Sequence, residues 1–115
     1  MASDVYKDFT KIGRVSTSGE VYYHDHKIGW VNGNGDIYRE GSWVGWITRA
    51  GNVLDVESNK IGFIDHAGNV YKGTTMLGRA ECATNRYYTG GAALLLLLYK
   101  PVGQPRQNLV PVLSY

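Results

Sequence analysis

The chain lacks several features that would assign it to a class at once: it has one cysteine, three prolines and little net charge among 115 residues. Because Cys82 is alone, no disulfide can form within the chain, which is compatible with a reducing, cytoplasmic setting. Twelve basic and ten acidic residues give a formal charge of +2, which is too balanced to indicate a nucleic-acid partner. The apolar run at residues 92–99 is far shorter than the ~20 residues of a membrane span. Residues 1–4 begin no signal peptide.

The sequence is instead rich in glycine and tyrosine, with fifteen and nine respectively, which favours turn-rich β structure. A phrase of the type Ile28-Gly29-Trp30-Val31 recurs about every sixteen residues, and a second turn glycine keeps step with it. The glycines of the first phrase are Gly13, Gly29, Gly45, Gly62 and Gly78, and those of the second are Gly19, Gly35, Gly51 and Gly68. Such periodicity predicts one small unit used repeatedly. The units lie near residues 11–26, 27–42, 43–59, 60–75 and a degenerate 76–91.

The unit at residues 27–42 is typical of a β-hairpin, because two β-favouring runs flank a loop in which Gly35 takes the left-handed conformation. Side-chain alternation places Val31 opposite Ile37 on one face, and Ile28, Trp30 and Tyr38 on the other. The equivalent opposed pairs are Val15 with Val21, Ile47 with Val53, and Ile64 with Val70. The glycine inside each strand predicts a close approach, which we expect to be made by an aromatic ring of the next unit.

Residues 4–7 match the second strand of a unit whose first strand is missing, while the fifth unit loses its pattern. Thr84 stands where the turn glycine is expected and Arg86 where the inward valine is expected, and only Tyr87 and Tyr88 keep the strand register. If the first strand pairs with the last unit, the array closes into a ring and leaves no exposed edge. An open stack with two capped ends is the alternative.

The composition changes after Gly90-Gly91, where two alanines precede five leucines: Leu94, Leu95, Leu96, Leu97 and Leu98. This apolar element at residues 92–100 favours a buried helix that plugs the β assembly, although a buried strand of the same length fits the pattern as well. The leucines also predict a homo-oligomer wherever the ring leaves them uncovered. We expect one domain at residues 1–100 and an irregular tail at residues 101–115.

The phrases Ile28-Gly29-Trp30-Val31 and Ile61-Gly62-Phe63-Ile64, the second continuing to the Gly68-Asn69-Val70-Tyr71 turn and strand, resemble the units of small bacterial β-flower families. They are also similar to bacterial WG repeats. The resemblance covers about residues 4–88. It implies an all-β fold of tandem hairpins of about sixteen residues around a pseudo-symmetry axis, with no catalytic residues to carry over.

Two sets of aromatic positions recur with the glycines. Trp30, Trp46 and Phe63 share one position with Arg14 and Arg79, and they form either packing contacts or a belt that stacks on sugars or planar ligands. The second set comprises Tyr22, Tyr38, Tyr71 and Tyr87, with Leu54 in the middle unit. Leucine at that position indicates that packing, rather than the hydroxyl group, is what the position requires.

Reactive side chains are scattered. On a strand, His24 and His26 would face the same side, a spacing that supplies two metal ligands, but a third ligand is not evident. Cys82 has no catalytic partners in the pattern, and the loop at residues 33–35 lacks the lysine of a phosphate-binding loop. The turn carboxylates Asp36, Asp55, Glu57 and Asp65 form no forced pair. No cofactor is expected.

The sequence therefore predicts a non-catalytic binding or assembly module. The first alternative is a carbohydrate-binding or aromatic-ligand-binding protein that uses the belt of Trp30, Trp46 and Phe63. The second is a metal-dependent enzyme that uses His24 and His26.

Overall fold

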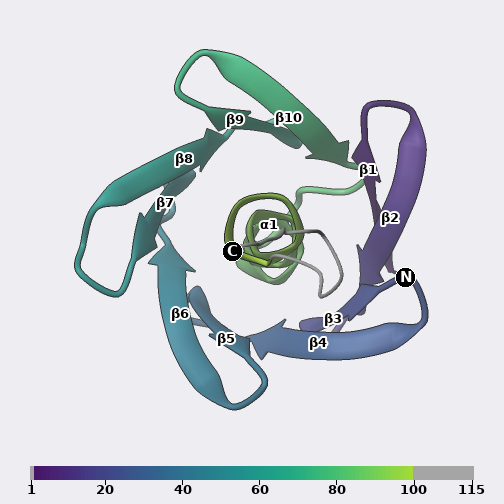
Figure 1. The fold of residues 1–115 in the computed structure, drawn as a ribbon, viewed down its shortest axis with the longest axis horizontal. Helices are drawn as coiled ribbons and strands as arrows, with labels where there is room; N and C mark the ends of the chain where they lie inside the picture. Colours follow the sequence, from purple (N-terminus) through teal and green to yellow (C-terminus); the bar gives the residue numbers. More distant parts are fainter. Residues whose placement is uncertain (1, 100–115) are drawn as a thin grey trace, which may run out of the picture.

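The computed structural model describes residues 2–99, so the predicted tail at residues 101–115 lies outside the described part of the chain. Within residues 2–99 the chain forms ten antiparallel strands closed into a barrel, with a short helix running along the barrel axis (Figure 1). The expected all-β class is confirmed. No helix within this range is both long and apolar enough to cross a membrane.

Each strand pairs with its sequence neighbours, and β1 pairs with β10. The strands are β1 (Ser3–Lys7), β2 (Thr10–Val15), β3 (Glu20–Tyr23), β4 (His26–Val31), β5 (Asp36–Arg39), β6 (Ser42–Ile47), β7 (Asn52–Asp55), β8 (Lys60–Ile64), β9 (Asn69–Lys72) and β10 (Thr75–Ala80). The axial segment comprises α1 (Arg86–Ala93) and the π-helical turn η1 (Leu94–Leu98).

The barrel closes between its first and last strands. Val5 lies opposite Ala80 and Tyr6 opposite Arg79 in the β1–β10 ladder. Beyond the ladder, the buried Ser3 hydroxyl donates to the Cys82 carbonyl at 2.7 Å and accepts from the Cys82 backbone N–H at 2.9 Å. The predicted closure is confirmed, and the open stack is wrong.

The loops between β2 and β3, β4 and β5, β6 and β7, and β8 and β9 adopt one conformation. In the second, Gly35 has φ +90 and its N–H donates to the Asn32 carbonyl at 3.0 Å. The Asn32 side-chain oxygen accepts from the backbone N–H groups of Asn34 and Asp36, both at 3.0 Å. The matching glycines Gly19, Gly51 and Gly68 have φ between +91 and +94, so the left-handed glycine of the loop is confirmed.

Each strand contributes a buried hydrophobic side chain to the lining of the barrel interior. The predicted opposed pairs Val31–Ile37, Val15–Val21, Ile47–Val53 and Ile64–Val70 are all present in the ladders. Val5 and Ala80 complete the lining. These side chains leave a narrow barrel interior, so only a helix with small side chains can pass between them.

The ladders within the strand pairs β1–β2, β3–β4, β5–β6, β7–β8 and β9–β10 each contain a β-bulge, and the extra residue precedes the strand glycine. In β4 that residue is Ile28, which is only 4% exposed and packs into the core. A bulge re-aims the side chain at that point. The expectation that Ile28 shares a face with Trp30 and Tyr38 is therefore wrong, because Ile28 points inward.

Helix α1 begins at Arg86, so the predicted strand register at Tyr87 and Tyr88 is wrong. Asn85 caps the helix by accepting from the Tyr88 N–H at 3.1 Å. Gly90 and Gly91 lie inside the helix, although glycine is a poor helix former. The narrow interior explains this, because a Cβ on Gly91 would overlap Val15 and a Cβ on Gly90 would lie 2.7 Å from Val31. Space within the barrel overrides local propensity.

The leucines of η1 contact the strand glycines, so the expected cover by aromatic rings is wrong. A Cβ built on these glycines would meet leucine methyl groups in four cases: Gly29 with Leu94, Gly13 with Leu95, Gly78 with Leu96, and Gly62 with Leu97. At Gly45 the nearest atoms belong to the backbone of residues 54 and 55. Within the predicted apolar element, residues 92–98 are thus helical and act as a plug.

The predicted self-association surface is wrong for Leu94 and Leu95, which are 0% and 5% exposed inside the barrel. Leu96, Leu97 and Leu98 are half-buried against the same core. A homo-oligomer through these last three leucines stays a prediction.

The small residues of α1 give a direct test of the fit. We expect Gly91→Ala to destabilise the fold by about 1–3 kcal/mol, because overpacking against Val15 outweighs the gain of about 1 kcal/mol in helix propensity. Urea unfolding followed by circular dichroism measures the change. Gly33→Ala is the control, since its Cβ would meet only the movable Tyr87 hydroxyl at 3.3 Å. Stabilisation by Gly91→Ala would contradict the narrow interior.

Candidate functional site

A groove of about 510 Å³ opens at the end of the barrel where the loops meet the start of α1. Its walls are formed by residues 48–51, residues 63–66 and most of residues 83–89, with Gly33 at one edge. Small-molecule sites in proteins commonly occupy about 300–1,000 Å³. The groove therefore has the size of a binding site for a small ligand.

Two arginines stand on the groove walls. Arg49 is exposed in the loop between β6 and β7. Arg86 is held in place, since it donates to the Asn34 carbonyl at 2.8 Å through Nη1 and to the Gly33 carbonyl at 3.3 Å through Nη2. A guanidinium has five N–H donors in a planar fork, so these two bonds leave donors of Arg86 for a further partner.

Asp65 brings a carboxylate to the groove, but its oxygens are used by its own loop. Oδ1 accepts from the backbone N–H groups of Ala67 and Asn69, at 3.0 and 2.9 Å, and Oδ2 accepts from the Asn69 side chain at 3.1 Å. Burial by itself raises the pKa of Asp65, but these bonds and the Gly68 N–H together lower that pKa below its ordinary value. Asp65 is therefore an ionised structural acceptor.

The first turn of α1 adds to the positive character of the groove. Thr84, Asn85, Arg86 and Tyr87 all line it, and the first turn of the helix contains no acidic residue. The N-terminus of a helix carries a partial positive charge. With Arg49, Arg86 and the exposed His66 nearby, the groove favours an anionic group.

The predicted aromatic belt is distributed around the barrel wall. Four members stand opposite a residue of the tyrosine position in the neighbouring strand: Arg14 opposite Tyr22, Trp30 opposite Tyr38, Trp46 opposite Leu54, and Phe63 opposite Tyr71. The fifth, Arg79, stands opposite Tyr6 of β1. Of the belt only Phe63 lines the groove. The belt residues lie on separate strands and do not converge on one site.

Most belt residues are stacked on the partner across the ladder. The Arg14 guanidinium lies 4.1 Å from the Tyr22 ring centroid, and the Trp30 and Tyr38 rings are stacked with centroids 5.1 Å apart. Where Leu54 replaces tyrosine, Trp46 stacks instead on Trp43 at 5.5 Å. Leu54 thus offers no aromatic partner, and Trp43 of the same strand as Trp46 supplies one instead.

The histidine pair does not have the geometry expected of it. His24 lies in the turn between β3 and β4 with φ +54, with its ring 4.4 Å from that of Tyr23, and His26 begins β4. The turn breaks the strand alternation that was to place both rings on one side. Among residues 2–99 no three side chains of histidine, cysteine, aspartate or glutamate gather closely enough to hold a metal ion.

Sequence reasoning did not find the groove. Arg49 and His66 were visible only as variable residues in loops, and the segment at residues 83–89 was assigned to a degenerate hairpin. The signal was the loss of the turn glycine at Thr84, which lies in the segment between the end of β10 at Ala80 and the start of α1 at Arg86.

Compared with protein-family models, with curated proteins and with solved structures, the chain shows no significant match.

The hydrogen bonds to Asp65 predict an acid-sensitive contribution to stability. Because its pKa is lowered on folding, ionised Asp65 stabilises the fold above the unfolded-state pKa, and this stabilisation is lost as the pH falls through the folded-state pKa. We expect Asp65→Asn to flatten the acid limb of a plot of unfolding free energy against pH. Urea titrations from neutral to acid pH measure it, with Asp25→Asn in an exposed turn as the control. An unchanged acid limb in Asp65→Asn would contradict the assignment.

Proposed function

We propose that the chain is a non-catalytic binding module built as a five-petalled β-flower, with its five strand pairs arranged around a pseudo-symmetry axis. Two observations support this arrangement. A bulge at the residue before the strand glycine occurs in all five pairs, and the loop glycines share one conformation. The resemblance to bacterial β-flower and WG-repeat units agrees with it.

The function supported best is the binding of a small ligand that carries a carboxylate or phosphate group. The observation that carries this proposal is the groove of about 510 Å³ with Arg49 and Arg86 on its walls. The only carboxylate among its lining residues belongs to Asp65, which is already bonded to its own loop. Phe63 adds an apolar surface, so a ligand with both an anionic group and a ring fits the walls.

The other functional readings receive less support from the geometry. A belt that acts as a single aromatic platform is disfavoured because its members lie on different strands. A metal-dependent enzyme needs a third ligand near His24 and His26. Assembly through the leucine run retains only the half-buried Leu96, Leu97 and Leu98. A cytoplasmic location rests on the sequence and stays a prediction.

Titration of ¹⁵N-labelled protein with benzoate, phthalate and phenyl phosphate tests the groove. We expect the backbone amide signals of residues 48–51, 65–66 and 84–87 to shift with concentration. Arg49→Ala should weaken binding by about tenfold or more, as expected from losing a hydrogen bond between charged groups. Added salt should weaken binding as well, because exposed charges are screened.

The matched control is Arg14→Ala, which removes an arginine that stacks on Tyr22 outside the groove. It should leave the affinity unchanged. Benzamide, which has the ring without the charge, should not bind. The proposal is overturned if the anions shift no groove amide, or if benzamide binds as well as benzoate.

A further inference from the structure

Two crevices occur at equivalent places where neighbouring strands separate beyond the strand glycine. The crevice between β2 and the turn after β3, here the β2/β3 crevice, has a volume of about 190 Å³. The crevice between β4 and the turn after β5, here the β4/β5 crevice, has a volume of about 180 Å³. The first is lined by Lys11, Ile12, Gly13, Arg14, His24 and Asp25, and the second by Lys27, Ile28, Gly29, Trp30, Glu40 and Gly41. Both crevices begin with a Lys-Ile-Gly sequence, and they differ in the remaining side chains.

Trp30 distinguishes the β4/β5 crevice. Its side chain stays 37% exposed although one face is stacked on Tyr38, with an angle of 10° between the rings. In the β2/β3 crevice the same position is held by Arg14, which is stacked on Tyr22. A fixed and partly exposed indole at the wall of a crevice presents an apolar surface at little entropic cost, because the stacked neighbour already holds the ring in position.

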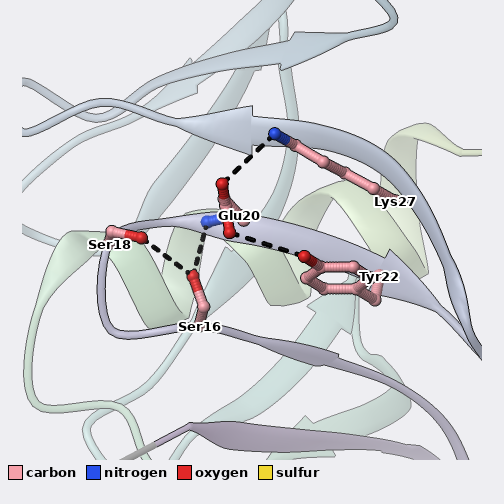
Figure 2. Close-up of polar contacts among 5 residues, drawn as sticks. All are labelled: Ser16, Ser18, Glu20, Tyr22 and Lys27. Atoms are coloured by element: carbon pink, nitrogen blue, oxygen red, sulfur yellow. Dashed lines mark hydrogen bonds and ion pairs between the residues drawn. The ribbon is translucent and has the colours of Figure 1, made fainter.

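Charged residues accompany Trp30 in the crevice and across the strand ladder. Glu40 lines the crevice from the turn after β5, where it has φ +52. Glu20 lies opposite Trp30 in the β3–β4 ladder. Figure 2 shows the Glu20 carboxylate accepting from the Lys27 ammonium at 3.3 Å and from the Tyr22 hydroxyl at 3.4 Å. Lys27 is thus ion-paired with Glu20, and Lys27 and Glu40 share the lining of the crevice with Trp30.

We propose that the β4/β5 crevice is a second binding site that takes one neutral pyranose ring. A pyranose combines a C–H face, which packs on an indole, with equatorial hydroxyls that need both donors and acceptors. Trp30 supplies the first requirement, and Lys27 and Glu40 supply the second. Lys27 is already paired with Glu20, so Glu40 leaves the crevice without a cationic excess and an acidic sugar is disfavoured. None of these residues lines the groove at the loop end.

The indole N–H signals of ¹⁵N-labelled protein test the proposal, with methyl β-D-glucopyranoside and cellotriose as probes. We expect the Trp30 signal to shift with sugar concentration, together with the amides of residues 27–29 and 40–41. Trp43 is an internal control, because it is 41% exposed and stacked on Trp46 but lies outside both crevices. Its indole signal should stay constant. Groove amides should not move, which separates this result from the anion titration.

Variants sharpen the test. Trp30→Arg gives the β4/β5 crevice the arginine found in β2/β3, and it should abolish the shifts of the crevice amides. Glu40→Gln keeps the size of an exposed side chain and should weaken binding by about tenfold, as expected from losing a charged hydrogen bond. Trp43→Phe should leave the affinity unchanged. Circular dichroism checks that each variant folds. If Trp30→Arg does not fold, Glu40→Gln still tests the proposal.

Three outcomes would overturn the proposal. The first is the absence of a Trp30 shift up to the solubility limit of the sugars. The second is an equal shift of the Trp43 indole, which would indicate non-specific contact with exposed aromatic rings. The third is stronger binding of glucuronate, or of p-nitrophenol without a sugar, than of the neutral glucoside.

Discussion

The contact between the axial helix and the barrel wall is the constraint on which the remaining structure depends. Successive leucines of η1 meet the glycines of successive strand pairs around the ring. Five strand pairs would require about five residues per turn for this to hold, whereas an α-helix has 3.6. The wider π-helical turn, closed by the bond from the Tyr99 N–H to the Leu94 carbonyl at 2.7 Å, comes closer to the spacing of the wall. We therefore attribute the rare helix type to the ring that encloses it.

Much of the wall follows from the sequence because its causes are local. The left-handed glycines of the loops and the opposed pairs such as Val31 with Ile37 depend on turn chemistry and on strand alternation, both of which act over a few residues. Closure was also predictable, because residues 4–7 carry the pattern of a strand that lacks a partner. The bulge at Ile28 was not predictable from alternation. Because Ile28 is the extra residue of the bulge, its side chain points to the inner face instead of lying beside Trp30. The neighbours of Trp30 were therefore predicted wrongly, although the strand itself was predicted correctly.

The axial segment was harder to predict because its causes are distant in sequence. From the sequence, Gly90 and Gly91 are expected to stand before the helix and not inside it, because two glycines would interrupt a helix in an isolated peptide. In the barrel they are required, since Val15 and Val31 occupy the space that larger side chains would need. Arg86 likewise read as a faulty strand residue, whereas it begins the helix and fixes it to the carbonyls of Gly33 and Asn34. The residues at these positions are determined by contacts with segments that are distant in sequence, and a local sequence pattern does not reveal such contacts.

The division between constrained and variable positions is consistent with our proposal that the chain is a binding module. Packing fixes one inward residue in each strand, the strand glycine and the loop glycine, and these positions recur along the chain with little variation. The positions that packing leaves free are those that differ, such as Arg49 and His66 within the loops, and Trp30 where another strand has Arg14. Arg49 in the groove and Trp30 in the crevice, on which the two candidate sites depend, come from these free positions. A wall of similar units thus holds dissimilar side chains in similar geometry, and the chemistry of each site follows from where one unit departs from the others.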